Sequence, residues 1–181
     1  LFISVLISPT LIRTKDSLAA MKKAGADRVG IAIDAATPQL FDQLRGSGVG
    51  GPHQWNHYWE VTRMAVSVFG RFYVGIHLIV GLGETEKEMV GAIQHGQNMG
   101  ASTHLFSFFP EKGSPMEKHS SPPLGQYRRI QLARWIINES PVSAGQMRFD
   151  EQGRLIDFGM DIESLVRIGE PFMTSGCPGR D

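Results

Sequence analysis

Three segments of the chain carry residues that suit the binding of a nucleotide-like cofactor. Asp34 follows an apolar run, and its carboxylate can accept two hydrogen bonds from a vicinal diol such as a ribose. Gly81 and Gly83 allow positive φ and a close backbone approach to a flat ligand. Phe109 and Pro110 offer an apolar shelf for a purine ring. The three segments therefore predict a site for a nucleoside-containing small molecule.

These residues also have purely structural interpretations. Asp34 can cap the turn that follows it, and the glycines can serve only a tight strand-to-helix turn. The Gly-x-Gly spacing does not complete the G-x-G-x-x-G pattern of dinucleotide-binding proteins. Glu84 is either a solvated charge ahead of a helix or an anchor of the turn. Thr85 and Glu88 form a capping-box pair, so we expect a helix to begin there and to point free N–H groups at the site.

Residues that bind metals are sparse. Cys177 is the only cysteine, so it cannot form an internal disulfide or a cysteine-rich metal site. His53 and His57 have the i, i+4 spacing of a helical metal pair, but no third ligand is evident and the neighbouring tryptophans favour packing. His77 and His104 lie within predicted strands. Each is either a satisfied core histidine or a group inside a barrel.

Apolar, β-rich runs alternate with helical patterns and must position these residues. Strands are predicted at residues 2–8, 28–34, 72–80 and 103–109. Helices are predicted at residues 14–24, 37–45, 55–69 and 85–99, with a last long helix that ends near residue 138. The alternation in residues 147–158 predicts a β-hairpin around a turn at 151–153, and Asp161 can cap a short helix that ends at Ile168.

These elements amount to four βα units, spaced as crossovers between parallel strands require. The continuous apolar strands predict an α/β fold with a parallel sheet that is covered on both faces. A partial TIM-type (β/α) barrel and an open doubly wound sheet both satisfy the pattern, and in both the loops after the strands converge on one edge, where ligands bind. We expect a single domain over residues 1–181, with four βα units in 1–140 and a C-terminal extension in 141–181.

Composition and charge exclude several functional classes. Lys plus Arg and Asp plus Glu each number 18, so no bulk field attracts nucleic acid or an anionic membrane. The apolar run that begins at Leu1 is too short for a membrane span and lacks the features of a signal peptide. It is typical of a buried strand whose upstream sequence is missing. The low cysteine content predicts a cytoplasmic, reducing compartment.

The segment around Gly81 resembles a known family. IHLIVGLGETEKEM is similar to the G-x-I-x-G-x-x-E segment of radical S-adenosylmethionine (SAM) enzymes, in the biotin synthase and lipoyl synthase branch. Ile79, Gly81 and Glu84 match that pattern, whereas His77 stands where glycine is usual. VGIAIDAATPQLFDQLRG resembles the family's ribose-side strand, with Asp34 at the acidic position, and FFPEKGSPM resembles the loop near the adenine. The matches cover roughly residues 28–116.

The resemblance implies the C-terminal part of a radical SAM barrel enzyme with two cofactors, SAM and a [4Fe–4S] cluster. In that family the reduced cluster cleaves SAM to a 5′-deoxyadenosyl radical, which abstracts hydrogen from an unactivated C–H bond. In this branch sulfur is then inserted at that carbon of a small-molecule or acyl-group substrate. The resemblance assigns cofactor binding to Asp34, Ile79, Gly81, Leu82, Gly83, Glu84, Phe109 and Pro110.

The sequence departs from the family at its redox centre. The C-x-x-x-C-x-x-C loop that holds the cluster is absent from residues 1–181, and one cysteine cannot hold a cubane, so we expect the ligands upstream of Leu1. The final run TSGCP resembles the tail of lipoyl synthase-like radical SAM proteins, but Arg180 stands where their second cysteine is expected. Cys177 is thus either a metal ligand or an inert thiol. By itself the chain would supply half of the SAM wall and none of the redox centre.

Two other functions are compatible with the sequence. One is a parallel-barrel enzyme that binds a phosphate or nucleotide at its loops and helix N-termini without iron. The other is a non-catalytic barrel half that pairs with a partner subunit, or with a missing N-terminal half, because open strand edges must be covered. Neither alternative needs nucleic acid or a membrane as a partner.

Overall fold

The computed structural model describes residues 2–173 and is built on a four-stranded parallel sheet. The strands are β1 (Ser4–Ile7), β2 (Arg28–Asp34), β3 (Val74–Val80) and β4 (Ser102–Ser107). They are hydrogen-bonded in the order β1-β2-β3-β4, so each strand lies beside its neighbour in the sequence. The predicted α/β class with a parallel sheet is confirmed. Three of the predicted strands run one or two residues too far at one or both ends.

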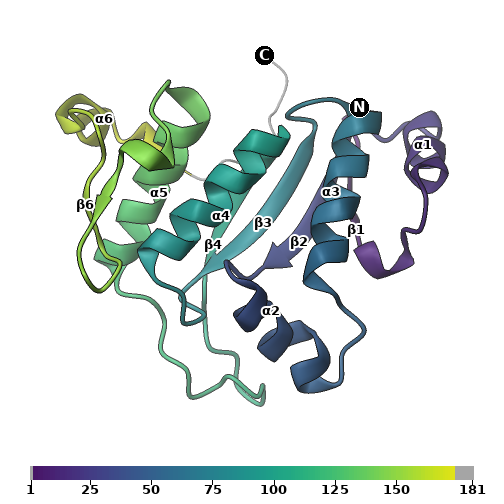
Figure 1. Ribbon diagram of the computed structural model, residues 1–181, viewed down its shortest axis with the longest axis horizontal. Coiled ribbons are helices and arrows are strands. Elements are labelled where there is room, and N and C mark those ends of the chain that lie inside the picture. Colours follow the sequence, from purple (N-terminus) through teal and green to yellow (C-terminus); the bar gives the residue numbers. More distant parts are fainter. Residues whose placement is uncertain (1, 174–181) are drawn as a thin grey trace.

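Helices connect the strands and form one layer against the sheet (Figure 1). Neighbouring helices also contact each other, α1 with α3, α3 with α4 and α4 with α5. Local signals define their ends: Thr37 caps α2 with Pro38 in its first turn, and α4 ends at Gly100 in a left-handed conformation. The helices are α1 (Lys15–Lys23), α2 (Pro38–Arg45), α3 (Trp55–Phe69), α4 (Glu86–Met99) and α5 (Leu124–Glu139).

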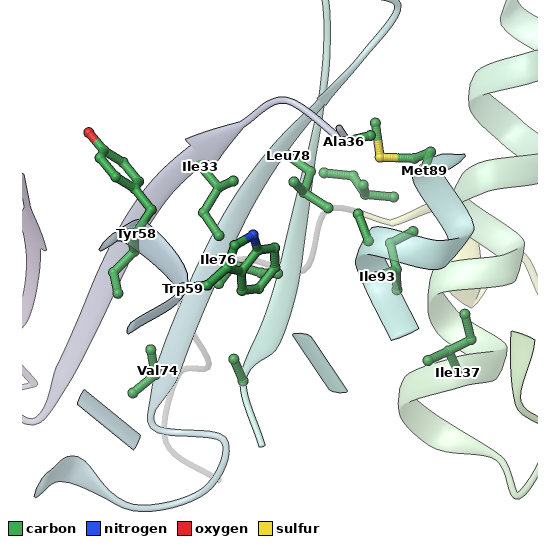
Figure 2. Close-up of a cluster of buried hydrophobic side chains, with 14 of the residues drawn as sticks. Ile33, Ala36, Tyr58, Trp59, Val74, Ile76, Leu78, Met89, Ile93 and Ile137 are labelled. Atoms are coloured by element: carbon green, nitrogen blue, oxygen red, sulfur yellow. The ribbon is translucent and has the colours of Figure 1, made fainter. Parts of the chain in front are cut away.

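The hydrophobic core lies between the sheet and this helix layer. In β3, Val74, Ile76, Leu78 and Val80 alternate with less buried residues and are inaccessible to solvent. Figure 2 shows strand side chains meeting those of α3, α4 and α5, among them Trp59, Met89, Ile93 and Ile137. Each fully buried aliphatic side chain contributes about 1.5–3 kcal/mol relative to an exposed one. Burial on this face therefore fixes the orientation of every strand.

The opposite face of the sheet carries no helix within residues 2–173. The expectation of a sheet covered on both faces is wrong for this part of the chain. Leu6 is 65% exposed and Phe106 is 48% exposed, although both belong to strands. We call this surface the open face. The strand alternation and register place on it Ser4, Leu6, Arg28, Gly30, Ala32, Gly75, His77, Ile79, Ser102, His104 and Phe106.

The C-terminal extension packs on α4 and α5. Its hairpin pairs β5 (Arg148–Phe149) with β6 (Leu155–Asp157) in antiparallel fashion, as predicted, and α6 (Glu163–Ile168) follows. The Glu86 carboxylate joins the parts: it accepts hydrogen bonds from the Arg129 guanidinium of α5 and from the backbone N–H of Leu155 in β6. Within the described residues, no helix is both long and apolar enough to cross a membrane.

Candidate functional site

The ends of β2, β3 and β4 bring the predicted site residues to one edge of the sheet. Asp34 is paired with Leu78, and Ile79 is paired with Phe106. The backbone N–H of Phe108 donates to the Val80 carbonyl, so the chain stays beside β3 as it leaves β4. The prediction that the three loops share an edge therefore holds in the structure.

Residues 81–85 form the β3–α4 turn, and Glu84 is its internal anchor. The carboxylate of Glu84 is buried and accepts hydrogen bonds from the backbone N–H groups of Gly81, at 2.7 Å, and of Leu82, at 2.9 Å. Burial raises the pKa of Glu84 above its ordinary value, while these amide hydrogen bonds act in the opposite direction. Both oxygens of the Glu84 carboxylate thus accept hydrogen bonds within the turn. Glu84 therefore stabilises the turn and does not have a free oxygen for a ligand.

The carbonyl of Gly81 and the space beside Gly81 are also used by the protein. His119 Nε2 lies 2.8 Å from the Gly81 carbonyl oxygen. Gly81 has φ of +101°, and a Cβ added there would lie 2.6 Å from Cδ of Pro122. Glycine is therefore required at this position both by its backbone conformation and by the close approach of the loop before α5.

The expectation that the start of α4 points free N–H groups at the site is weakened, because the protein itself uses the N–H groups of Thr85, Lys87 and Glu88. The Thr85 N–H donates to the Glu88 carboxylate, and the Glu88 N–H donates to Thr85 Oγ1, which completes the capping box. The Lys87 N–H donates to the carbonyl of Gly153 in the β5–β6 turn. Because these donors are satisfied, the N-terminus of α4 is a poor site for a phosphate or another anion.

Asp34 is held by an arginine that the sequence analysis missed. Arg45, at the end of α2, places Nη1 2.5 Å from Asp34 Oδ2 and also donates to the Ala32 carbonyl. Asp34 has φ of +66° and follows a register shift between Ala32 and Asp34, so its side chain leaves the regular alternation of β2. Burial raises the pKa of Asp34, and the Arg45 charge opposes that rise. Oδ1 makes no hydrogen bond to any residue between 2 and 173.

The network continues from Arg45 into α3. Arg45 Nη2 lies 3.4 Å from the hydroxyl of Tyr58, which is 2.6 Å from His53 Nδ1. His53 precedes α3, and His57 instead bonds the Pro9 carbonyl, so the two histidines do not form a helical metal pair. A basic residue at the end of the helix after an acidic strand terminus is the signal that could have identified Arg45.

The other predicted residues differ in how accessible they are. Ile79 lies on the open face and is partly buried, whereas the Leu82 side chain is buried. Phe109 is 75% exposed, and Pro110 beside it is partly exposed. Cys177, the candidate metal ligand, lies outside the described residues. Within residues 2–173, no group of three or more His, Cys, Asp or Glu side chains could hold a metal ion.

The open face carries two imidazoles. His77 and His104 are register partners on β3 and β4, and their ring centroids are 5.6 Å apart. Neither side chain belongs to the core beneath the helices, so the interpretation as core histidines does not apply to them. Burial lowers the pKa of His77. On the helix side, burial and then the Arg63 charge lower the pKa of His95.

These two histidines predict a pH dependence of stability. Since their pKa values are lower in the folded chain than in the unfolded one, the unfolded chain binds more protons in weakly acidic solution. Their contribution to the free energy of unfolding, and that of His53, whose pKa burial also lowers, should therefore rise as the pH increases from about 5.5 to about 7.5. Urea unfolding at several pH values measures this slope. Replacing both residues (His77→Asn with His95→Asn) should flatten it, and an unchanged slope in the double variant would contradict the assignment.

Two hollows on the molecule border α3. One, of about 420 Å³, is bordered by α2, the loop after it and the start of α3, including Phe41, His53 and Trp55. Another of about 410 Å³ lies between α3 and α4 beside Trp59 and His95. At the edge that holds Asp34 and Gly81, the loop before α5 packs against Gly81 through His119 and Pro122.

Comparison with known proteins adds no family assignment: no family model matches the chain, and no curated protein matches it significantly. The fold and the site together define an α/β protein with a parallel sheet. Its polar and glycine-rich strand ends gather at the carboxyl edge of that sheet.

Proposed function

We propose that this chain forms one wall of the SAM site in a radical SAM enzyme with a partial (β/α) barrel. The observation that carries the proposal is the meeting of Asp34, with Oδ1 open to a ligand, and the β3–α4 turn at the ends of adjacent strands. Catalytic groups of barrels lie at this edge. Consecutive strand order with helices on one side also favours a barrel over a doubly wound sheet, which carries helices on both faces.

The residues present fit a SAM molecule that lies along this edge. Arg45 fixes one oxygen of Asp34, which leaves Oδ1 to accept hydrogen bonds from a ribose diol. Gly83, at positive φ, allows the turn to lie close to the ligand, and Ile79 lies on the strand that leads into this turn. Phe109 is exposed at the next strand end, where it can cover a purine ring.

A bound cluster and SAM together would supply the radical that removes hydrogen from an unactivated C–H bond, and sulfur insertion is the outcome that the resemblance favours. The residues of this chain would bind and orient SAM and exclude water. The described residues contain no cysteine, so they cannot hold the cluster. We therefore expect its ligands upstream of Leu1. The phosphate-binding alternative is less well supported, because the start of α4 is capped.

SAM binding after removal of the Asp34 carboxylate tests the proposal. With Asp34→Ala we expect the dissociation constant for SAM to rise roughly tenfold or more, since a hydrogen bond to a charged group is lost. Isothermal titration of SAM into the chain measures this constant. Asp157→Ala is the matched control, because that carboxylate lies in the C-terminal hairpin. Equal affinity of the two variants would remove Asp34 from the site, and a wild-type chain that does not bind SAM would contradict the proposal.

A further inference from the structure

The open face has an ordered pattern of side chains that SAM at the strand ends does not use. One row across the sheet contains Ala32, His77 and His104, which are paired on adjacent strands. The row toward the N-terminal ends of the strands has glycine at its centre, at Gly30 and Gly75. Because Gly30, Ala32 and Gly75 have little or no side chain, the two imidazoles have room to lie over the backbone of the sheet.

The glycines make room for the imidazole rings. A Cβ added to Gly30 would lie 3.3 Å from His77 Nε2, and one added to Gly75 would lie 2.7 Å from His104 Nε2. Each ring therefore leans across the glycine of the preceding strand. The two rings meet edge to face, with an interplanar angle of 86°. The sheet thus holds both imidazoles in fixed positions, beside the apolar side chains of Leu6 and Phe106 and with Arg28 toward the N-terminal end of β2.

The imidazole nitrogens of His77 have no hydrogen-bond partner among the described residues. Its ring contacts His104 and Phe106, at a centroid distance of 5.2 Å for the latter, but it makes no hydrogen bond to another residue in the range 2–173. A partly buried imidazole without such a bond favours a ligand that supplies one. The nearest carboxylate on the strands of this face, that of Asp34, is already paired with Arg45.

We propose that His77, with His104 beside it, binds the carboxylate of a small aliphatic molecule on the open face. The imidazole of His77 supplies an N–H donor for an oxygen acceptor. Leu6, Ile79 and Phe106 surround them with apolar surface for the aliphatic part. Ile79 lies two residues beyond His77 on the same strand, or about 6.6 Å. A ligand anchored at His77 therefore extends toward the strand ends. Its identification as the substrate of the reaction rests on the proposed function.

Side-chain ¹⁵N NMR of the histidine-labelled 181-residue chain tests this binding, with acetate, butyrate and hexanoate as probes. We expect shifts at His77 and His104 and not at the remaining four histidines. Affinity should rise by up to about fourfold per added methylene, the limit for full burial of the group. Hexanol, which lacks the carboxylate, should bind at least roughly tenfold more weakly than hexanoate.

Three variants locate the site. His77→Asn should weaken hexanoate binding roughly tenfold, whereas the matched control His95→Asn, on the helix side, should leave it unchanged. If His77→Asn does not fold, Gly30→Ala displaces the His77 ring without removing it and should have the same direction of effect. Equal binding of hexanoate and hexanol, or shifts spread over all six histidines, would overturn the proposal. So would a site at which Zn²⁺ shifts both rings and hexanoate shifts neither.

A SAM titration of the same sample separates the two proposals. Hexanoate binding without SAM binding would contradict the radical SAM assignment and keep the carboxylate site. SAM binding at the Asp34 edge without hexanoate shifts at His77 would overturn the carboxylate site alone.

Discussion

Arg129→Leu is expected to lower the free energy of unfolding by about 3 kcal/mol. The variant leaves the Glu86 carboxylate, which is 5% exposed, without its guanidinium partner. Breaking a buried ion pair from one side costs about 3–5 kcal/mol. We expect the lower end, because a quarter of the Arg129 side chain reaches solvent. Urea unfolding followed by circular dichroism measures the change.

A matched control and a rescue variant separate this effect from simple loss of an arginine. Arg148→Leu removes a guanidinium from the exposed pair with Asp157 and should cost less than about 1 kcal/mol. Combining Glu86→Gln with Arg129→Leu should recover much of the loss, since the amide oxygen can still accept from the Leu155 N–H without carrying a charge. Equal costs for Arg129→Leu and Arg148→Leu would show that Glu86 is not a buried anchor of the C-terminal extension.

Gly81→Ala is expected to be similarly destabilising, by about 3 kcal/mol in total. A side chain at a left-handed φ costs roughly 1–2 kcal/mol, and the added Cβ would collide with Pro122 at 2.6 Å. Relief of such a collision by a backbone shift costs a further 1–3 kcal/mol or so. Because the turn would have to move, the proposed SAM affinity should fall as well. Urea unfolding and SAM titration of the variant give the two values.

Other glycines with positive φ provide the comparison. Gly169 has φ of +74°, and no atom lies within 4 Å of a Cβ added there. For Gly169→Ala we therefore expect the free energy of unfolding to fall only by the conformational cost of about 1 kcal/mol. In Gly83→Ala the added Cβ would lie 3.5 Å from Leu40, an ordinary contact distance, so we again expect only the conformational cost. Adding Pro122→Gly to Gly81→Ala should remove the collision and leave the conformational cost. If all three glycine variants lower the free energy of unfolding by the same amount, the close approach of Pro122 to Gly81 does not contribute to the cost of Gly81→Ala.

The sequence was sufficient for the elements because their signals are local. The alternation of Val74, Ile76, Leu78 and Val80, and the capping box of Thr85 and Glu88, depend on residues within a few positions of each other. For the same reason the hairpin at β5 and β6 was predicted correctly. Parallel strands also place their carboxyl ends at one edge, so the meeting of Asp34 with the β3–α4 turn followed from strand polarity.

Only the tertiary structure decided which polar groups remain available to a ligand, because those partners come from distant positions. The carbonyl of Gly153 accepts a hydrogen bond from the Lys87 N–H at the start of α4, and the guanidinium of Arg45 pairs with one oxygen of Asp34. The carboxylate of Glu84 accepts hydrogen bonds from the backbone of its own turn and is buried, which decides between the two interpretations of Glu84 that the sequence left open. The helix layer covers a single face, so His77 and His104 became surface groups on the open face. Sequence periodicity reports that a strand is buried, but the connections between strands determine which face the helices cover.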